Sequence, residues 1–144
     1  APSSLTRLHD LGVQPFLTAA TILGVLAQRL VRKLCPHCKQ ESFLNEQEWQ
    51  HLAADYPLPR PEFVFKAVGC EECRHTGYKG RIGIYEFMPL SLTTKQLIGA
   101  DANLNQLRQQ AKKEGVEPLR IAGARKILEG VTTLEEVLRV VPLN

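Results

Sequence analysis

The first hydrophobic residues of the chain are spaced three positions apart. Leu5, Leu8 and Leu11 would lie on one face of a short helix, because residues three or four positions apart share a helical face. Ser3 or Ser4 precedes this run and can cap the helix with its hydroxyl group. We therefore expect the chain to begin with a short helix that has one apolar face.

A longer apolar segment follows Pro15, which can open the next element. Its leucine-rich positions recur at helical spacing, and most of the other positions are apolar too. This pattern predicts a helix over residues 23–34 that is buried nearly all round. The residues that carry the pattern are Leu23, Leu26, Ala27, Leu30 and Leu34. Because residues 1–34 contain too little else to cover such a helix, part of its core should come from later segments or from outside the chain.

Residues 45–56 carry the signals of a further helix. Asn45 and Glu48 have the spacing of a capping box, in which the two residues satisfy free N–H groups at a helix start. Prolines at positions 57, 59 and 61 end the helix and stiffen the segment that leads from it towards the second cysteine pair. The apolar face would be formed by Trp49, Leu52, Ala53 and Tyr56.

Two apolar runs predict strands, and the last third of the chain predicts helices. Residues 63–65 fit a short strand, and residues 82–88 fit a strand with both faces mostly buried. From Ser91 onward, capping signals and glycines predict about four short helices. One of them starts at Thr133 with a capping box that includes Glu136.

Four cysteines occur in two pairs of the same spacing, and the chain contains no others. Two CxxC pairs favour one tetrahedral zinc site with four thiolate ligands, two from each tight turn. Two disulfides would need an oxidising compartment, and no signal peptide is visible at the start. A redox CxxC normally occurs as a single pair at a strand-to-helix turn. The predicted zinc ligands are Cys35, Cys38, Cys70 and Cys73.

The two cysteine pairs are unusually far apart. Thirty-one residues separate Cys38 from Cys70, whereas a compact zinc ribbon has roughly 15–20. The metal would therefore close a long insertion with structure of its own. A site with four protein thiolates has no open position for water, so this zinc would be structural rather than catalytic. His37 and His75 lie close by in sequence, but four cysteines already fill the site, so we expect both imidazoles to face solvent.

Composition excludes more functions than it supports. A chain of 144 residues with 44% hydrophobic residues can form one domain or two small ones. A net charge of +3 is too small to imply nucleic acid without a clustered patch, and the longest apolar stretch is interrupted by charges. The sequence contains no GxxxxGK[ST] phosphate loop, no HExxH and no GxSxG.

Basic residues offer the remaining candidate chemistry, with two interpretations. Arg29 belongs to a run with Arg32, Lys33 and Lys39 that either ends a helix in solvent or contacts an anion. Arg81 lies between glycines at the start of an apolar strand, where a buried charge would need a partner. That partner would be either a structural ion pair or a phosphate or ribose group.

Five longer strings in the chain are distinctive. They are RLHDLG at 7–12, VLAQRLVRKLCPxC at 25–38, GCxxC at 69–73, GYKGRxGIYE at 77–86 and GVTTLEEVLRV at 130–140. In this order, and over nearly the whole length of the chain, they resemble the type II secretion and type IV pilus assembly traffic ATPases. The sequence GVLAQRLVRKLC at 24–35 resembles the type II branch more than the pilus branch.

The resemblance implies that the chain is the C-terminal part of a longer protein, an α/β fragment with mostly helical content. The family's phosphate-binding loop, acidic boxes and histidine box would lie upstream of Ala1. Residues 1–34 would be the tail of a RecA-like P-loop ATPase domain, and residues 35–77 an inserted tetracysteine zinc subdomain. Residues 78–90 would return a strand to the ATPase domain, and residues 91–144 would form a C-terminal helical subdomain. The resemblance also implies that Arg81, and more weakly Arg29, lie near the nucleotide.

The resemblance further implies what the parent protein does. It would be a hexameric ATPase at the cytoplasmic face of the inner membrane, using ATP and Mg²⁺ to drive secretion or pilus assembly through membrane platform proteins. This chain would supply scaffold, a structural Zn²⁺ and a subunit interface. It lacks the phosphate-binding loop, so alone it should not hydrolyse ATP.

Two other functions remain open from the sequence. One is a zinc-ribbon module that binds nucleic acid. The long insertion between the cysteine pairs, the acidic Glu71 and Glu72 within the second CxxC pair and the scarcity of aromatic residues argue against it. The other is a stand-alone adaptor that binds or regulates the motor.

Overall fold

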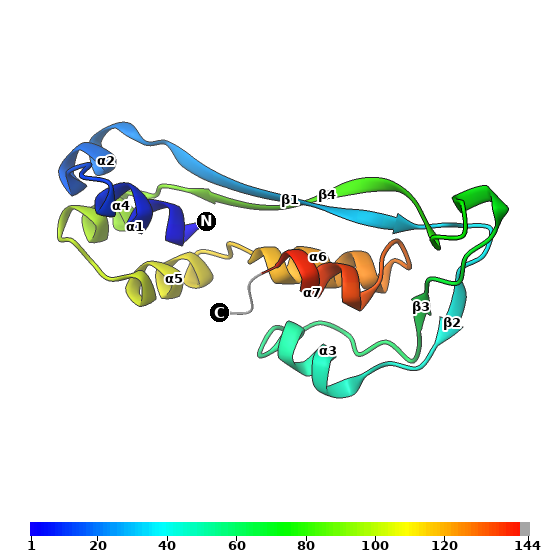
Figure 1. The fold of residues 1–144 in the computed structure, drawn as a ribbon. Helices are drawn as coiled ribbons and strands as arrows, with labels where there is room; N and C mark the ends of the chain where they lie inside the picture. The colour runs from blue at the N-terminus through cyan, green and yellow to red at the C-terminus, as the bar shows by residue number, and fades with distance from the viewer. Residues whose placement is uncertain (142–144) are drawn as a thin grey trace. The chain divides into compact units, whose positions relative to one another are not determined.

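The computed structural model describes residues 1–141 (Figure 1). Within this range the chain forms seven α-helices, four strands and a short 3₁₀ turn. In chain order they are α1 (Pro2–Asp10), α2 (Pro15–Thr21), β1 (Gly24–Leu34), β2 (Gln40–Ser42), α3 (Glu46–Ala53), β3 (Val64–Lys66), η1 (Glu71–Cys73), β4 (Tyr78–Pro89), α4 (Leu92–Gly99), α5 (Leu104–Lys113), α6 (Leu119–Leu128) and α7 (Leu134–Val140).

The elements group into two compact units, each made of two stretches of chain. The first unit comprises Ala1–Ala27 and Tyr85–Pro118, and the second comprises Gln28–Ile84 and Leu119–Asn144. The four helices expected after Ser91 are present, but α4 and α5 belong to the first unit, while α6 and α7 belong to the second.

The segment expected to be a buried helix at 23–34 is a strand, so that prediction is wrong. β1 pairs with β4 in a two-stranded sheet, and Leu26 is 60% exposed. The hydrogen bonds from Leu90 N–H to Leu23 C=O and from Cys35 N–H to Gly77 C=O mark its two ends, so the strands are antiparallel. Leucine forms helices readily, but pairing with a distant strand decides the conformation here.

A second, smaller sheet lies within the insertion between the cysteine pairs. β2 and β3 are antiparallel, with Gln40 opposite Lys66 and Ser42 opposite Val64. α3 connects them and starts as expected at Asn45, whose side chain accepts a hydrogen bond from Glu48 N–H. This hydrogen bond satisfies one of the N–H groups in the first turn of α3 that have no partner within the helix.

The first unit is held together by a small core beneath α1, α2, α4 and α5. α2 packs against α4, and α5 packs against both α1 and α4. α1 begins at Pro2 without a side-chain cap, so neither Ser3 nor Ser4 has the expected capping role. The buried residues of this core are Leu5, Met88, Leu90, Ile98, Leu107 and Ala111.

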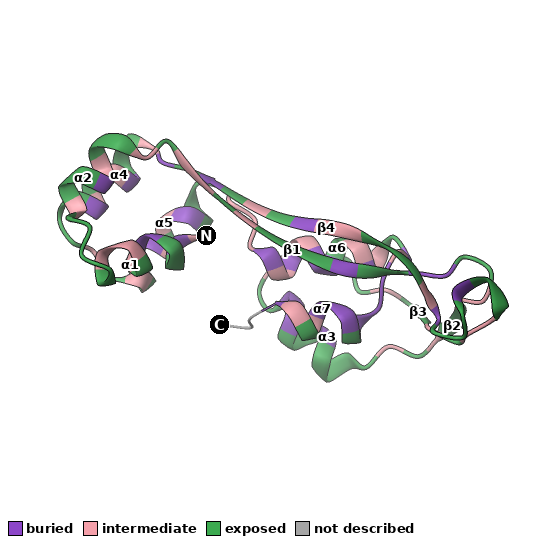
Figure 2. Ribbon diagram, turned by 45° about the horizontal axis from the view of Figure 1, so that its top comes forward, coloured by how far each residue is buried: buried purple, intermediate pink, exposed green. Residues whose placement is uncertain are grey.

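The second unit has the larger core, formed where α3, α6 and α7 meet one face of the long strands (Figure 2). Arg120 on α6 donates to the Leu52 carbonyl oxygen at 2.6 Å and lies over the Tyr56 ring, which ties α3 to α6. The buried residues include Val31, Trp49, Leu52, Ile84, Ile127 and Val137.

The strand expected at 82–88 is present within β4, but only one of its faces is buried. Ile84 and Met88 are buried, whereas Tyr85 and Phe87 are 52% and 58% exposed. An exposed aromatic face on a strand usually marks a surface that another part of a protein covers.

Candidate metal centre

The two cysteine pairs lie where the long strands meet the insertion. Cys35 directly follows β1, and the N–H groups of Cys38 and Lys39 turn back onto the Cys35 carbonyl oxygen. Cys70 directly precedes the 3₁₀ turn η1, Cys73 is its last residue, and β4 begins five residues later at Tyr78. Because β1 and β4 are paired, their ends bring the two tight turns together.

The geometry of the four sulfur atoms fits a tetrahedral metal site. All four Sγ atoms lie within 4.8 Å of one another. Three of the distances, Cys35 to Cys70, Cys38 to Cys73 and Cys70 to Cys73, are 3.8 Å. Four sulfurs at about 2.3 Å from a central zinc would lie about 3.8 Å apart in a tetrahedron. All four cysteines are free thiols, so the structure contains neither of the disulfides that the sequence left open.

Backbone N–H groups point at the sulfurs, as they do around metal-bound thiolates. Gly69 N–H lies 3.3 Å from Cys38 Sγ, and the N–H groups of Cys70 and Gly77 lie 3.3 and 3.1 Å from Cys73 Sγ. Such donors stabilise negative charge on sulfur and fix the orientation of each ligand.

The tight turns depend on two glycines. Gly69 and Gly77 have φ angles of +114° and +84°, which side chains rarely adopt. A β-carbon at Gly77 would lie 2.5 Å from that of Ala67, and one at Gly69 would lie 2.9 Å from the His75 carbonyl oxygen. The backbone of both turns therefore approaches its neighbours too closely for any side chain.

The thiols differ in acidity. Burial acts to raise the pKa of Cys73, but the N–H groups of Cys70 and Gly77 outweigh it and lower this pKa to about 6. Burial raises the pKa of Cys38 to about 11, against the hydrogen bond from Gly69 N–H. Metal binding needs thiolates, so binding must displace protons and become weaker in acid.

The remaining residues singled out from the sequence lie outside the cluster. His37 and His75 are exposed, as expected, and so are Glu71 and Glu72. Arg81 is exposed on β4 and forms no ion pair with any residue in 1–141, so the structural ion pair considered for it is absent there. Arg29 is exposed on β1 and donates to the Gln28 carbonyl oxygen.

A buried carboxylate near the cluster was not anticipated as a partner of the strands. Glu136 on α7 is 2% exposed and accepts hydrogen bonds from the guanidinium groups of Arg32 and Arg139. The capping-box interpretation identified Glu136 but gave its side chain a local role. Thr133 does cap the start of α7, accepting from Glu136 N–H, but the Glu136 carboxylate reaches a strand 104 positions away in sequence.

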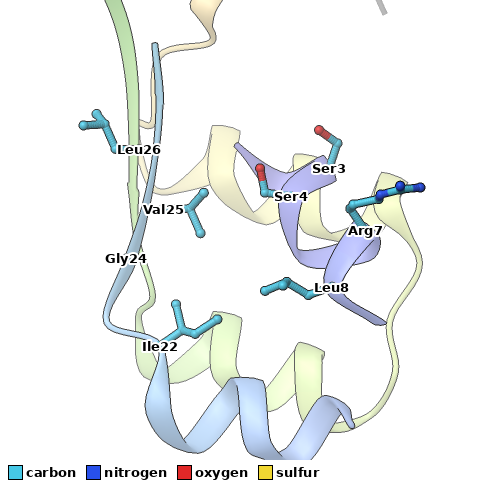
Figure 3. Close-up of a pocket in the computed structure, with 8 residues that line it drawn as sticks. All are labelled: Ser3, Ser4, Arg7, Leu8, Ile22, Gly24, Val25 and Leu26. Carbon is cyan, nitrogen blue, oxygen red and sulfur yellow. The ribbon is translucent and has the colours of Figure 1, made fainter. Parts of the chain in front are cut away.

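A cleft of about 640 Å³ lies in the first unit, between α1 and the start of β1 (Figure 3). α1 contributes three polar side chains and Leu8, and the segment around the start of β1 contributes apolar residues. The lining contains two serine hydroxyl groups but no carboxylate, histidine or cysteine that could act as a base beside them. The lining residues are Ser3, Ser4, Arg7, Leu8, Ile22, Gly24, Val25 and Leu26.

Comparison with protein families matches residues 1–139 to the type II/IV secretion system protein family. The chain belongs to this family. The match begins at the first residue of the chain and includes both cysteine pairs and α7. It supports the resemblance in both of its branches, because the family covers type II and type IV systems alike.

Relatives from both branches are similar over almost all of the chain. The type IV pilus assembly ATPase TfpB of Acinetobacter baylyi is 73% identical over 144 residues, the whole chain and 25% of that relative. The type II secretion system protein E of Pseudomonas aeruginosa is 44% identical over 140 residues, 97% of the chain and 27% of the relative. The type IV pilus assembly ATPase PilB of Myxococcus xanthus is 39% identical over 142 residues, 96% of the chain and 25% of the relative.

The chain thus spans about a quarter of these relatives. The identities do not separate the two branches, because the type II relative at 44% lies between the two pilus relatives at 73% and 39%, and the preference for the type II branch from residues 24–35 stays a prediction. None of the helices in residues 1–141 has the length and hydrophobicity needed to cross a bilayer.

Proposed function

We propose that this chain is the C-terminal part of an ATPase that drives type IV pilus assembly or type II secretion. The family match over residues 1–139 carries the proposal, together with relatives named as type IV pilus assembly ATPases and one from Vibrio cholerae named as a type II secretion system ATPase, all about four times as long. Both systems stay within the proposal, because the identities to relatives of the two branches do not separate them.

Residues 1–34 and 78–90 would belong to the RecA-like ATPase domain of the parent. Support comes from the first unit, where Leu26, Tyr85 and Phe87 expose apolar side chains on neighbouring strands. The open cleft beside α1 is part of the same unit. Upstream segments of the parent would cover these surfaces, because a large domain rarely leaves such a face in water.

The cysteine cluster would hold a structural Zn²⁺ that closes residues 35–77 into a subdomain, with residues 91–144 supplying the C-terminal helices. The sulfur spacing and the N–H groups aimed at the sulfurs support zinc. Four thiolates leave no position for water on the metal, so the chain's own chemistry at this site is to bind and orient, not to react.

Arg81 and Arg29 would lie near the nucleotide in the parent. Both guanidinium groups are exposed, and Arg81 has no ion-pair partner within residues 1–141, so its charge is available to a phosphate. Arg81→Gln in the parent should raise the KM for ATP several-fold. Arg74→Gln is the matched control, because Arg74 is also exposed. Equal KM values for wild type and Arg81→Gln would contradict this role.

The parent would work as a hexamer at the cytoplasmic face of the inner membrane, coupled to membrane platform proteins. Hydrolysis of ATP with Mg²⁺ would require its phosphate-binding loop, which this chain lacks. The chain itself would then serve as scaffold and subunit interface.

A linked-enzyme assay of ATP hydrolysis, on the purified chain and on the parent, tests whether the activity depends on segments outside this chain. We expect hydrolysis by the parent and none by the chain. Mass spectrometry of protein purified without added metal should find one zinc per chain. Robust hydrolysis by the chain alone, or absence of zinc, would contradict the corresponding part of the proposal.

A further inference from the structure

The turn between α6 and α7 (residues 129–133) lies against the base of the metal-bearing insertion. Leu34, the residue before Cys35, donates its N–H to the Val131 carbonyl oxygen at 2.8 Å. Lys39, the residue after Cys38, donates from Nζ to the Gly130 carbonyl oxygen at 2.9 Å, and Nζ also lies 4.6 Å from the centre of the Phe65 ring. One turn therefore holds both flanks of the first cysteine pair.

α7 adds a second set of contacts to the end of β1. Arg32 donates its backbone N–H to Glu136 Oε2 at 2.9 Å and two guanidinium N–H groups to Oε1 at 2.9 and 2.6 Å. Thr132 returns a hydrogen bond from its hydroxyl to the Arg32 carbonyl oxygen at 2.8 Å. The backbone of β1 is thus fixed on both its N–H and its C=O side, three residues before the first ligand.

The second cysteine pair is attached to the same helix through Tyr78. The Arg32 guanidinium carbon lies 4.1 Å from the centre of the Tyr78 ring, and the Tyr78 hydroxyl is 2.8 Å from the Thr133 hydroxyl. Tyr78 follows Gly77, whose carbonyl oxygen accepts from Cys35 N–H at 2.9 Å. The start of α7 therefore contacts both the strand that precedes the first pair, β1, and the strand that follows the second pair, β4.

From these contacts we propose that metal binding at the cysteine cluster is coupled to the docking of α7, with Glu136 as a positioning residue that acts through Arg32. Glu136 touches no sulfur. It fixes the ends of β1 and β4, so the four thiols are already in position when a metal ion arrives. Less of the chain then has to become ordered when the metal binds. By linkage, the metal must in turn stabilise the docked α7 by the same factor.

The test uses the 144-residue chain and Zn²⁺ as the probe. Zinc affinity is measured by competition with a chromophoric chelator, under conditions in which circular dichroism shows every metal-free variant folded. Glu136→Gln keeps the size of the side chain and removes its charge. We expect about tenfold weaker zinc binding and faster release, a coupling within the common 5–150-fold range.

Glu135→Gln is the matched control, because Glu135 is the neighbouring residue on α7 and is exposed. Its zinc affinity should stay within twofold of wild type. If Glu136→Gln does not fold without metal, Thr132→Val provides the measurement, since it removes the bond to the Arg32 carbonyl at almost constant volume. It should also weaken zinc binding, by several-fold.

Hydrogen exchange tests the reverse direction. Removing zinc from the wild-type chain should lower protection of the α7 amides by about the same factor, while α5 in the first unit keeps its protection. Unchanged zinc affinity in folded Glu136→Gln, or unchanged protection of α7, would overturn the coupling.

The inference depends on the proposed zinc site, but the two can fail separately. A wild-type chain that binds no zinc would overturn both the site and the coupling. A wild-type chain that binds zinc as tightly as the Glu136→Gln variant would overturn the coupling alone.

Discussion

Gly123 on α6 faces Val137 on α7 so closely that no side chain fits between the two helices. A β-carbon at position 123 would lie 2.5 Å from Val137 Cγ1. Both positions are buried in the second unit, next to Ile84 of β4. Gly123→Ala should therefore lower the free energy of unfolding by about 1–3 kcal/mol, the usual cost of overpacking a core. Thermal or urea unfolding of the zinc-loaded chain measures it.

Gly99→Ala is the control for this prediction. Gly99 ends α4, and a β-carbon there would meet nothing within 4 Å. The substitution should be neutral or stabilise by up to about 0.5–1 kcal/mol, because alanine favours helices over glycine. Equal effects at both positions would show that packing between α6 and α7 is not the cause.

Glu136 should make the stability of the second unit depend on pH in acid. Burial acts to raise the pKa of its carboxyl group, but hydrogen bonds from Arg32 and Arg139 prevail and lower it from 4.5 to about 2. The contribution is therefore complete above about pH 4.5 and is lost as the pH falls towards 2. It amounts to no more than about 3 kcal/mol, because both guanidinium groups are half-exposed and solvent weakens the attraction.

Urea unfolding of the metal-free chain and of Glu136→Gln between pH 6 and pH 2 would measure this term. The difference in free energy between the two should be constant near pH 6 and shrink below about pH 4.5. A difference that stays constant down to pH 2 would show that charge on Glu136 plays no part.

Local signals in the sequence predicted several elements, and non-local pairing explains what they missed. The start of α3 at Asn45, the strand at β3 and the start of α7 at Thr133 each follow from residues a few positions apart. The segment 23–34 does not, because its leucines fit a helix, while the partner that makes it a strand lies more than 40 residues away in sequence. Capping at Ser91, where the side chain accepts from Thr94 N–H, is local and could have been recognised.

The same distinction applies to the candidate site. The repeated CxxC spacing already pointed to four sulfurs around one metal, and the structure brings those sulfurs together. The contacts of Arg32 and Lys39 with the α6–α7 region join residues about 90–100 positions apart. No local pattern encodes them, although a carboxylate one turn into a helix and an arginine before a CxxC pair are both visible in the sequence.

Cys70→Ser should loosen the insertion and leave the first unit intact. The substitution removes one of four ligands, so zinc affinity should fall by orders of magnitude. Hydrogen exchange should then show lost protection across residues 39–69, with α4 and α5 unchanged because they share no core with the insertion. Glu71→Gln, an exposed change in the same turn, is the control. Uniform loss of protection along the chain would contradict two separate units.

Leu26→Gln should affect the isolated chain and the parent differently. Leu26 is 60% exposed on β1, so in the chain alone the substitution should change the free energy of unfolding by no more than about 0.5 kcal/mol and reduce self-association. If upstream segments cover β1 in the parent, the same change should cost about 2 kcal/mol or more there. Equal, small effects in both proteins would argue against a covered strand. Unfolding and light scattering give the two readouts.

The insertion between the cysteine pairs is fastened at two separate points, and this has a mechanical consequence. The cluster closes its base, while Trp49 and Leu52 of α3 are buried in the core with α6 and α7. If the cluster holds zinc as proposed, a pull on α3 would have to separate α3 from α6 and α7 before the metal–sulfur bonds carried the full load. Losing the metal would free the base and leave the packing of α3 on α6 and α7 as the insertion's remaining attachment, so the protection of the whole insertion should then depend on that one contact.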